Sequence, residues 1–196
     1  MINSSSEEGM LCTNGMSMSS RDSKWSNAAV VVTVRSEDSG PDALAGIEFQ
    51  REIERRAFVA GGGMFRAPCQ GVSCFLSRKI DSTLPRTSYV NGVVPSALDS
   101  FLPGWICAEL RAGLASFDKR MKGFASSAVL IGAETRTSSP VRVTRGEDFQ
   151  SVSHRGLYPV GEGAGYAGGI VSSAIDGIRC ADVIIDVINM QKQGMP

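Results

Sequence analysis

A glycine-rich stretch at residues 156–170 constrains the fold of this chain more than any other segment. It reads Gly-Leu-Tyr-Pro-Val-Gly-Glu-Gly-Ala-Gly-Tyr-Ala-Gly-Gly-Ile. Its apolar run at 157–160 predicts a short buried strand. Beyond the glycines, apolar residues recur every three or four positions, at Ile170, Ala174, Ile178, Ala181, Ile185 and Ile188. The predicted order is therefore strand, glycine-rich turn and amphipathic helix.

Such a turn suits a ligand that approaches the backbone closely. Glycine leaves space beside the main chain, and a helix N-terminus offers free N–H groups and the positive end of a dipole. A phosphate or the polar edge of a cofactor would fit there. A tight turn that packs a helix closely on a sheet, with Gly168 and Gly169 admitting neighbouring backbone, is the structural alternative. Spacing alone leaves both interpretations open.

Residues 163–168 match the dinucleotide fingerprint G-x-G-x-x-G. That fingerprint also needs a second strand ending in an acidic residue about twenty positions later. The sequence has no room for this strand before Pro196, and Asp186 falls inside the helical pattern. The segment instead fits the last element of a flavin-binding domain, where the Glu162 carboxylate would accept a hydrogen bond from a ribityl hydroxyl.

The composition narrows the class of protein. The 196 residues suffice for one sizeable core or two small units. A formal net charge of zero argues against nucleic-acid binding, which needs a basic face. No run of about eighteen apolar residues occurs, so we expect a soluble protein with no membrane span. The polar, acidic start resembles neither a secretory signal nor a basic transit peptide.

The cysteines and the histidine predict no metal site. The five cysteines are scattered and form no Cys-x-x-Cys pair, which favours free thiols in a reducing compartment. Cys69 and Cys74 share a loop rich in Gly and Pro, so a thiol role is the weaker alternative. A Cys/His zinc site would have to rely mostly on thiolates, because His154 is the sole histidine.

The remaining segments alternate between strand and helix patterns. Apolar runs rich in β-branched residues predict extended segments at 28–34, 128–133 and 141–143. Helical periodicity predicts helices at 42–58, 95–101 and 103–121. Residues 72–76 fit a strand or a short helix, and Asn14-Gly15 indicates a hairpin turn.

Several stretches together resemble a family of FAD-dependent dehydrogenases, or FAD/NAD(P)-binding oxidoreductases, of bacteria and plant plastids. The matching segments are 6–9, 14–17, 27–32, 60–63, 67–70, 134–142 and 156–170. The match spans essentially the whole chain and is most specific in the last segment. The resemblance is to the C-terminal half of the family, because the N-terminal βαβ unit with its own G-x-G-x-x-G is missing.

The resemblance implies an α/β fold with an α+β insert. Residues 1–127 would belong to an inserted substrate or cap domain, and residues 128–196 would be the closing strand and helix of a Rossmann-like FAD domain. The FAD-binding residues would be Gly161, Glu162, Gly163, Ala164, Gly165, Tyr166, Ala167, Gly168, Gly169 and Ile170. Further pocket-lining candidates are Asn14, Gly15, Arg136, Ser138 and Ser139. No catalytic residue can be named from residue type, since a flavin carries the redox step itself.

The function predicted at this stage is that of a C-terminal part of an FAD-dependent oxidoreductase acting on a small molecule. A truncated, non-catalytic α/β fragment that binds no flavin alone is the alternative, because contacts to the adenine and ribose would be missing. For a plant protein the resemblance would imply a plastid location. An enzyme that holds a different phosphate ligand at the same turn is a third hypothesis.

Overall fold

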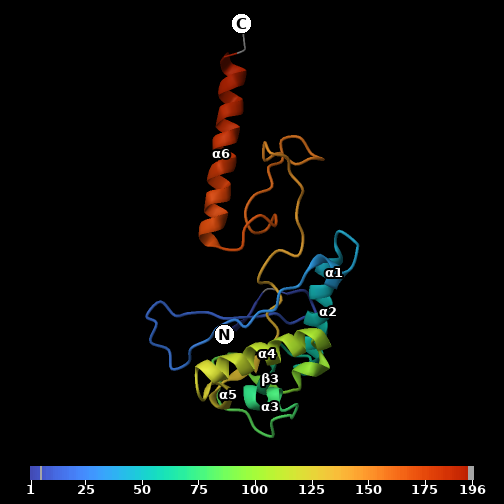
Figure 1. The fold of residues 1–196 in the computed structure, drawn as a ribbon, viewed down its shortest axis with the longest axis vertical. Helices are drawn as coiled ribbons and strands as arrows, with labels where there is room; N and C mark the ends of the chain where they lie inside the picture. The colour runs from blue at the N-terminus through green and yellow to red at the C-terminus, as the bar shows by residue number, and fades with distance from the viewer. Residues whose placement is uncertain (5, 194–196) are drawn as a thin grey trace. The chain divides into compact units, whose positions relative to one another are not determined.

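The computed structural model describes residues 1–4 and 6–193 as a mixed α/β protein. The chain folds into two compact units. Unit 1 comprises residues 1–40 and 48–135, and unit 2 comprises residues 41–47 and 136–196. Figure 1 shows the order of the elements along the chain. The last three residues of the expected segment 128–196 lie outside the described residues.

A three-stranded sheet forms the centre of unit 1, in the order β4-β3-β5. The central strand is β3 (Ala67–Gly71), whose first four residues are buried. It pairs in parallel with β4 (Val93–Pro95) and antiparallel with β5 (Val129–Ile131). Cys69 of β3 is paired with Pro95 of β4 on one side and with Ile131 of β5 on the other. Because both edges of β3 are paired, its backbone groups are satisfied although the strand is buried.

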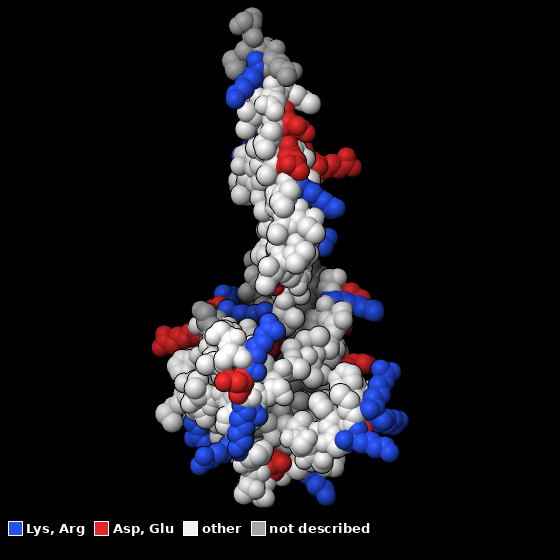
Figure 2. All heavy atoms as spheres, turned by 90° about the vertical axis from the view of Figure 1, so that its left-hand side faces the viewer, with Lys and Arg blue, Asp and Glu red and all other residues white. Residues whose placement is uncertain are grey.

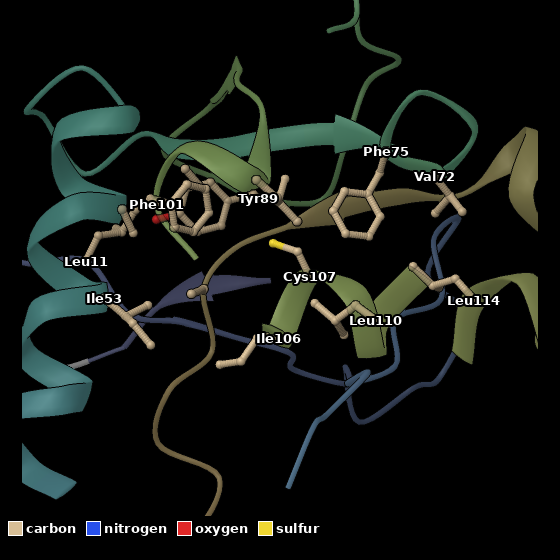
Figure 3. Packing of buried hydrophobic residues seen from close by; sticks show 14 of the residues in the cluster. Leu11, Ile53, Val72, Phe75, Tyr89, Phe101, Ile106, Cys107, Leu110 and Leu114 are labelled. Atoms are coloured by element: carbon tan, nitrogen blue, oxygen red, sulfur yellow. The ribbon is translucent and has the colours of Figure 1, made fainter. Parts of the chain in front are cut away.

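Helices surround this sheet and complete the core of unit 1. They are α2 (Ala45–Ala60), α3 (Val72–Leu76), the 3-10 helix η1 (Leu98–Ser100), α4 (Gly104–Arg120) and α5 (Phe124–Ser127). Figure 3 shows Phe75 and Val72 of α3 above the apolar face of α4, which presents Cys107, Leu110 and Leu114. The spacing of these α4 residues is the helical period of one buried stripe.

The N-terminal segment of unit 1 adds a small antiparallel pair. β1 (Ile2–Asn3) pairs with β2 (Thr13–Asn14), with Ile2 opposite Asn14. Leu11 and Cys12 are buried just before β2. The expectation of a hairpin turning at Asn14-Gly15 is therefore wrong, because Asn14 lies within a strand whose partner precedes it.

The expected strand at 28–34 is also wrong, since no ladder pairs these residues. Val30 and Val32 pack against the core, whereas Val31 and Val34 are exposed. This alternation of packed and exposed side chains is typical of an extended chain that has one side against the core. The next residues contain the short helix α1 (Ser36–Ser39).

Most of the other helices and strands predicted for unit 1 are confirmed. The helices expected at 42–58 and 103–121 are confirmed as α2 and α4, and 72–76 is the short helix α3. The strand expected at 128–133 is confirmed over its central residues as β5. The helix expected at 95–101 is wrong except for η1, because β4 extends to Pro95.

Unit 2 consists largely of irregular chain and one long helix, α6 (Ile170–Gln193). The helix predicted after the glycines is thus confirmed. The strand expected at 157–160 is wrong, because these residues form no ladder and Leu157 and Val160 are exposed. Residues 141–143 likewise form no strand, and an isolated bridge joins Arg145 to Ser151. Within the described range, no helix combines the length and hydropathy that crossing a bilayer requires.

Candidate cofactor-binding turn

Two glycines with left-handed backbone shape the turn at residues 161–170. Gly161 has φ +75° and Gly165 has φ +83°, a region that disfavours other residues. The Tyr166 N–H donates to the Gly161 carbonyl at 3.0 Å, and the Gly165 N–H donates to the Glu162 carbonyl at 2.9 Å. A Cβ on Gly165 would lie 2.5 Å from the Val141 carbonyl oxygen. Glycine is therefore required at 165 by both conformation and space.

The segment 139–143 holds the turn from one side. The Ser139 Oγ donates to the Gly163 carbonyl at 3.1 Å, and the Arg142 Nε donates to the Gly165 carbonyl at 3.1 Å. The Val143 N–H donates to the Ala164 carbonyl at 3.1 Å. These three bonds satisfy the carbonyl groups of residues 163–165 within the chain.

An ion pair fixes the turn to α6. Arg145 donates through Nη1 and Nη2 to the two carboxylate oxygens of Asp176, at 2.9 and 2.7 Å. The Gly161 N–H donates to the same carboxylate at 2.9 Å, and Arg145 also donates to the Pro159 carbonyl. The side chains of Arg145 and Asp176 are only 11% and 13% exposed. The hydrogen bonds from Arg145 lower the pKa of the Asp176 carboxyl, and Asp176 in turn raises the pKa of Arg145.

Two aromatic rings enclose the Arg145 guanidinium. Its centre lies 3.7 Å from the Tyr166 ring centroid and 4.1 Å from the Phe149 centroid. The Tyr166 hydroxyl donates to the Val143 carbonyl and accepts from the Arg145 N–H, each at 3.2 Å. Tyr166 thus stacks on a cation of its own unit through cation–π attraction.

The start of α6 presents a set of uncommitted backbone donors. In the described part of the chain, the N–H groups of residues 168–172 donate to no protein acceptor. Ile170 is 92% exposed at this end of the helix. A Cβ added at Gly163 or Gly168 would meet no atom within 4 Å. The backbone is therefore accessible there to a ligand oxygen.

Of the other residues predicted to line a pocket, some belong to the same unit as the turn and others belong to unit 1. Ser139 contacts the turn directly, whereas Ser138 and Arg136 are exposed residues of unit 2. Asn14 and Gly15 belong to unit 1, where they line a cavity of about 200 Å³ together with Glu134.

Sequence reasoning missed Arg145 and Asp176, which hold the turn in place. The available signal was Asp176, an acidic residue within the first two turns of an otherwise apolar helix. Its partner could not be found from spacing, because Arg145 lies 31 residues away in an irregular segment. Glu134 was also missed as a cavity residue, although it directly follows a predicted strand.

The described cysteines are free thiols, and no described group of His, Cys, Asp and Glu side chains could hold a metal ion. Burial raises the pKa of Cys69 to about 12. A hydrogen bond with Asp81 raises the pKa of Cys74. Both thiols therefore stay protonated near neutral pH, which argues against a nucleophilic role.

The residues at the turn fit one edge of a flavin cofactor. The uncommitted N–H groups match carbonyl or phosphate oxygens, and the open side of Gly163 and Gly168 lets a planar group reach the backbone. The Glu162 carboxylate is half-buried and adds an acceptor for a hydroxyl. Since Gly163, Gly168 and Ile170 are exposed, the turn makes one wall of a site.

Comparison with known proteins identifies the family to which the chain belongs. The family described as "FAD-dependent protein, C-terminal domain-like" matches residues 1–137. The chain belongs to this family. The matched range covers all of unit 1 together with residues 41–47 and 136–137 of unit 2, and it stops before the glycine-rich turn.

A second comparison includes the turn. A protein of Clostridium beijerinckii, described as an uncharacterized protein, is 44% identical over 98% of this chain. The aligned part is 37% of that relative, so the chain spans little more than a third of its length. The similarity extends through unit 2, which the family match does not cover.

Proposed function

We propose that this chain is the C-terminal part of an FAD-dependent oxidoreductase, and that residues 161–170 form one wall of its flavin site. The observation that carries the proposal is the row of uncommitted N–H groups at residues 168–172, beside backbone that is open at Gly163 and Gly168. Membership of an FAD-dependent family supports flavin as the ligand.

The residues of the turn would bind and orient the cofactor. The N–H groups at the start of α6 would donate to oxygens of the flavin or its pyrophosphate, where the helix dipole favours negative charge. Glu162 would accept a hydrogen bond from a ribityl hydroxyl. When bound, FAD supplies the electron-transfer chemistry itself. The Arg145–Asp176 pair would keep the turn and the helix N-terminus in one geometry before the cofactor arrives.

The remaining predicted residues take supporting roles in this proposal. Residues 1–127 would form the substrate or cap domain, and residues 128–196 would close the FAD domain. Asn14 and Gly15 would line a pocket of unit 1, and Arg136, Ser138 and Ser139 would line a pocket of unit 2. Ser139 has a direct structural basis for its role, since it bonds to the Gly163 carbonyl.

The long helix indicates where the rest of the flavin site would come from. Its predicted inner face is exposed, with Ile178 62% and Ile185 53% accessible. Figure 2 shows uncharged surface along part of α6, with acidic and basic side chains beside it. Contiguous apolar surface that is exposed in this way is typical of an interaction site. The residues that the longer relative has beyond the aligned part would cover this face and supply the adenine and ribose contacts.

A non-catalytic α/β fragment that binds no flavin by itself is the second candidate. The exposure of the turn favours it for the isolated chain, because a single wall buries little of a ligand. The two candidates differ in what the isolated chain binds. Under both candidates, the turn would form one wall of a flavin site in a longer protein.

Absorption spectra of two purified proteins test the proposal. We expect the Clostridium beijerinckii relative to carry bound flavin, and the 196-residue chain to bind added FAD weakly in a fluorescence titration. A relative that purifies without flavin and binds no added FAD would contradict the FAD assignment. A chain that retains stoichiometric flavin on its own would rule out the non-catalytic candidate.

A further inference from the structure

A cavity in unit 1 combines three polar side chains whose hydrogen-bonding capacity is not fully used. It has a volume of about 200 Å³ and is lined by Met1, Asn14, Gly15, Asn27, Ala28, Ala29 and Glu134. This is several times the volume of about 30 Å³ that one water occupies, and below the 300–1,000 Å³ of typical drug-sized clefts. The size therefore suits a compact ligand or one small group of a larger ligand.

Glu134 supplies an acceptor at this cavity. It is half-buried and follows β5, the edge strand of the unit 1 sheet. Within the described range, its carboxyl has no hydrogen bond or ion pair. Burial raises the pKa of Glu134, and no charged neighbour offsets this effect. A half-buried carboxyl without a partner gains most from a ligand that donates hydrogen bonds.

The two asparagines extend this acceptor surface. The Asn27 Nδ2 donates to the Met16 carbonyl at 3.2 Å, which turns its Oδ1 toward Gly15. A Cβ at Gly15 would lie 2.2 Å from that oxygen, so glycine is what allows Asn27 to take this position. The Asn14 amide has no partner among the described residues and can donate or accept.

The charges around the cavity decide which ligands it favours. Glu134 carries the sole ionisable side chain among the described lining residues, and the Met1 amino group donates to the Ser88 carbonyl and Oγ. No Lys, Arg or His side chain is among the described lining residues, and two of the three N–H donors of the Met1 ammonium are already bonded to Ser88. Ala28 and Ala29 offer an apolar wall against which a flat group can pack.

We propose that this cavity binds a compact ligand with a planar N–H-donating edge, a primary amide or an amidinium group, and that it rejects carboxylates. The Glu134 carboxyl and the Asn27 Oδ1 accept from the ligand, and Asn14 completes the set. The inference goes beyond the proposed function, because it names the chemical class of a ligand for the unit 1 cavity and requires no flavin.

Three probes of the same size and shape test this proposal on the 196-residue chain: benzamidinium, benzamide and benzoate. The backbone amides of Gly15, Ala28 and Ala29 are followed in ¹H–¹⁵N correlation spectra at about pH 8, where carboxyls are largely ionised. We expect benzamidinium and benzamide to shift these signals in a saturable way. We expect benzoate to leave them unchanged at the same concentrations.

Two variants identify the groups responsible. Glu134→Gln keeps the shape but removes the charge, and should weaken benzamidinium binding about tenfold or more while changing benzamide binding less than about threefold. Glu8→Gln is the matched control, because Glu8 is exposed and does not line the cavity. Asn14→Leu should weaken binding of both probes.

The proposal is overturned if benzoate binds as tightly as benzamidinium, or if Glu134→Gln leaves benzamidinium binding unchanged. Absence of saturable shifts at Gly15, Ala28 and Ala29 with every probe would also overturn it. These measurements do not involve FAD, so their results do not depend on whether the flavin proposal is correct.

Discussion

Arg145 and Asp176 form a two-bond ion pair that joins an irregular loop to the second turn of α6. The two bonds measure 2.9 and 2.7 Å, and both side chains are largely buried. Asp176 also accepts the N–H of Gly161, the first glycine of the candidate flavin-binding turn. One carboxylate therefore fixes the loop, the turn and the helix to one another within unit 2.

Removing this carboxylate should loosen unit 2. Asp176→Ala leaves the Arg145 guanidinium and the Gly161 N–H without their acceptor, which we expect to lower the free energy of unfolding by about 1–3 kcal/mol. Chemical denaturation followed by circular dichroism measures this change. Asp182→Ala on the same helix, at an exposed position, is the control and should change stability little.

The same pair predicts a loss of stability in acid. Because the folded-state pKa of Asp176 is lowered, its contribution is fully present above the unfolded value of about 3.9 and is lost as the pH falls through the folded value. The difference in stability between wild type and Asp176→Ala should therefore shrink below about pH 4. A constant difference across the acid range would show that the charge of Asp176 does not matter.

Two glycines of the turn should respond differently to the same substitution. Gly165→Ala places a Cβ 2.5 Å from the Val141 carbonyl at a residue with φ +83°, so we expect a loss of more than about 1 kcal/mol. Gly163→Ala meets no atom within 4 Å and should change stability by less than about 0.5 kcal/mol. Thermal unfolding of both variants tests this contrast, and equal losses would refute it.

The contribution of core packing in unit 1 to stability can be tested at Leu114. Leu114 on α4 is fully buried in the cluster of Figure 3. Leu114→Ala should lower the free energy of unfolding by about 2–5 kcal/mol, because it removes apolar contacts and leaves a cavity. Val59→Ala, at a position 74% exposed on α2, should have little effect.

Glu134 should affect stability in the direction opposite to Asp176. Its folded-state pKa is raised by burial, so its ionisation destabilises the fold. Stability is highest below the unfolded pKa of about 4.3 and falls as the pH rises through the folded value. Glu134→Gln should therefore be more stable than wild type near pH 8, with the advantage disappearing near pH 4. A disadvantage that persists at pH 8 would mean that the carboxylate has a stabilising partner.

Helical periodicity predicted the long helices correctly, because α2, α4 and α6 each follow a regular pattern of apolar residues. The strand predictions were less successful. Residues 28–34 and 157–160 have strand-like composition, yet neither finds a partner strand. A strand depends on pairing with distant residues, so local composition does not determine it.

The candidate site, too, could be predicted only where its residues are adjacent in sequence. The glycines, Glu162 and the helix start are adjacent in sequence, so their pattern predicted the turn. Arg145 and Asp176 meet only through the folded path of unit 2, and Asn14, Asn27 and Glu134 come from distant segments of unit 1. The exposure of α6 also could not be foreseen, because an apolar helical stripe usually marks a face buried within its own domain.

The central claim, that the turn at residues 161–170 faces the flavin, is tested most directly by FAD affinity in a chimera. In the chimera, this chain replaces the aligned part of the Clostridium beijerinckii relative. We predict that it binds FAD and that Gly163→Val weakens binding about tenfold or more, because the side chain fills the open side of the backbone. Gly104→Val in unit 1, also in open space, is the control. A folded chimera that binds FAD equally well with valine at 163 would contradict the account.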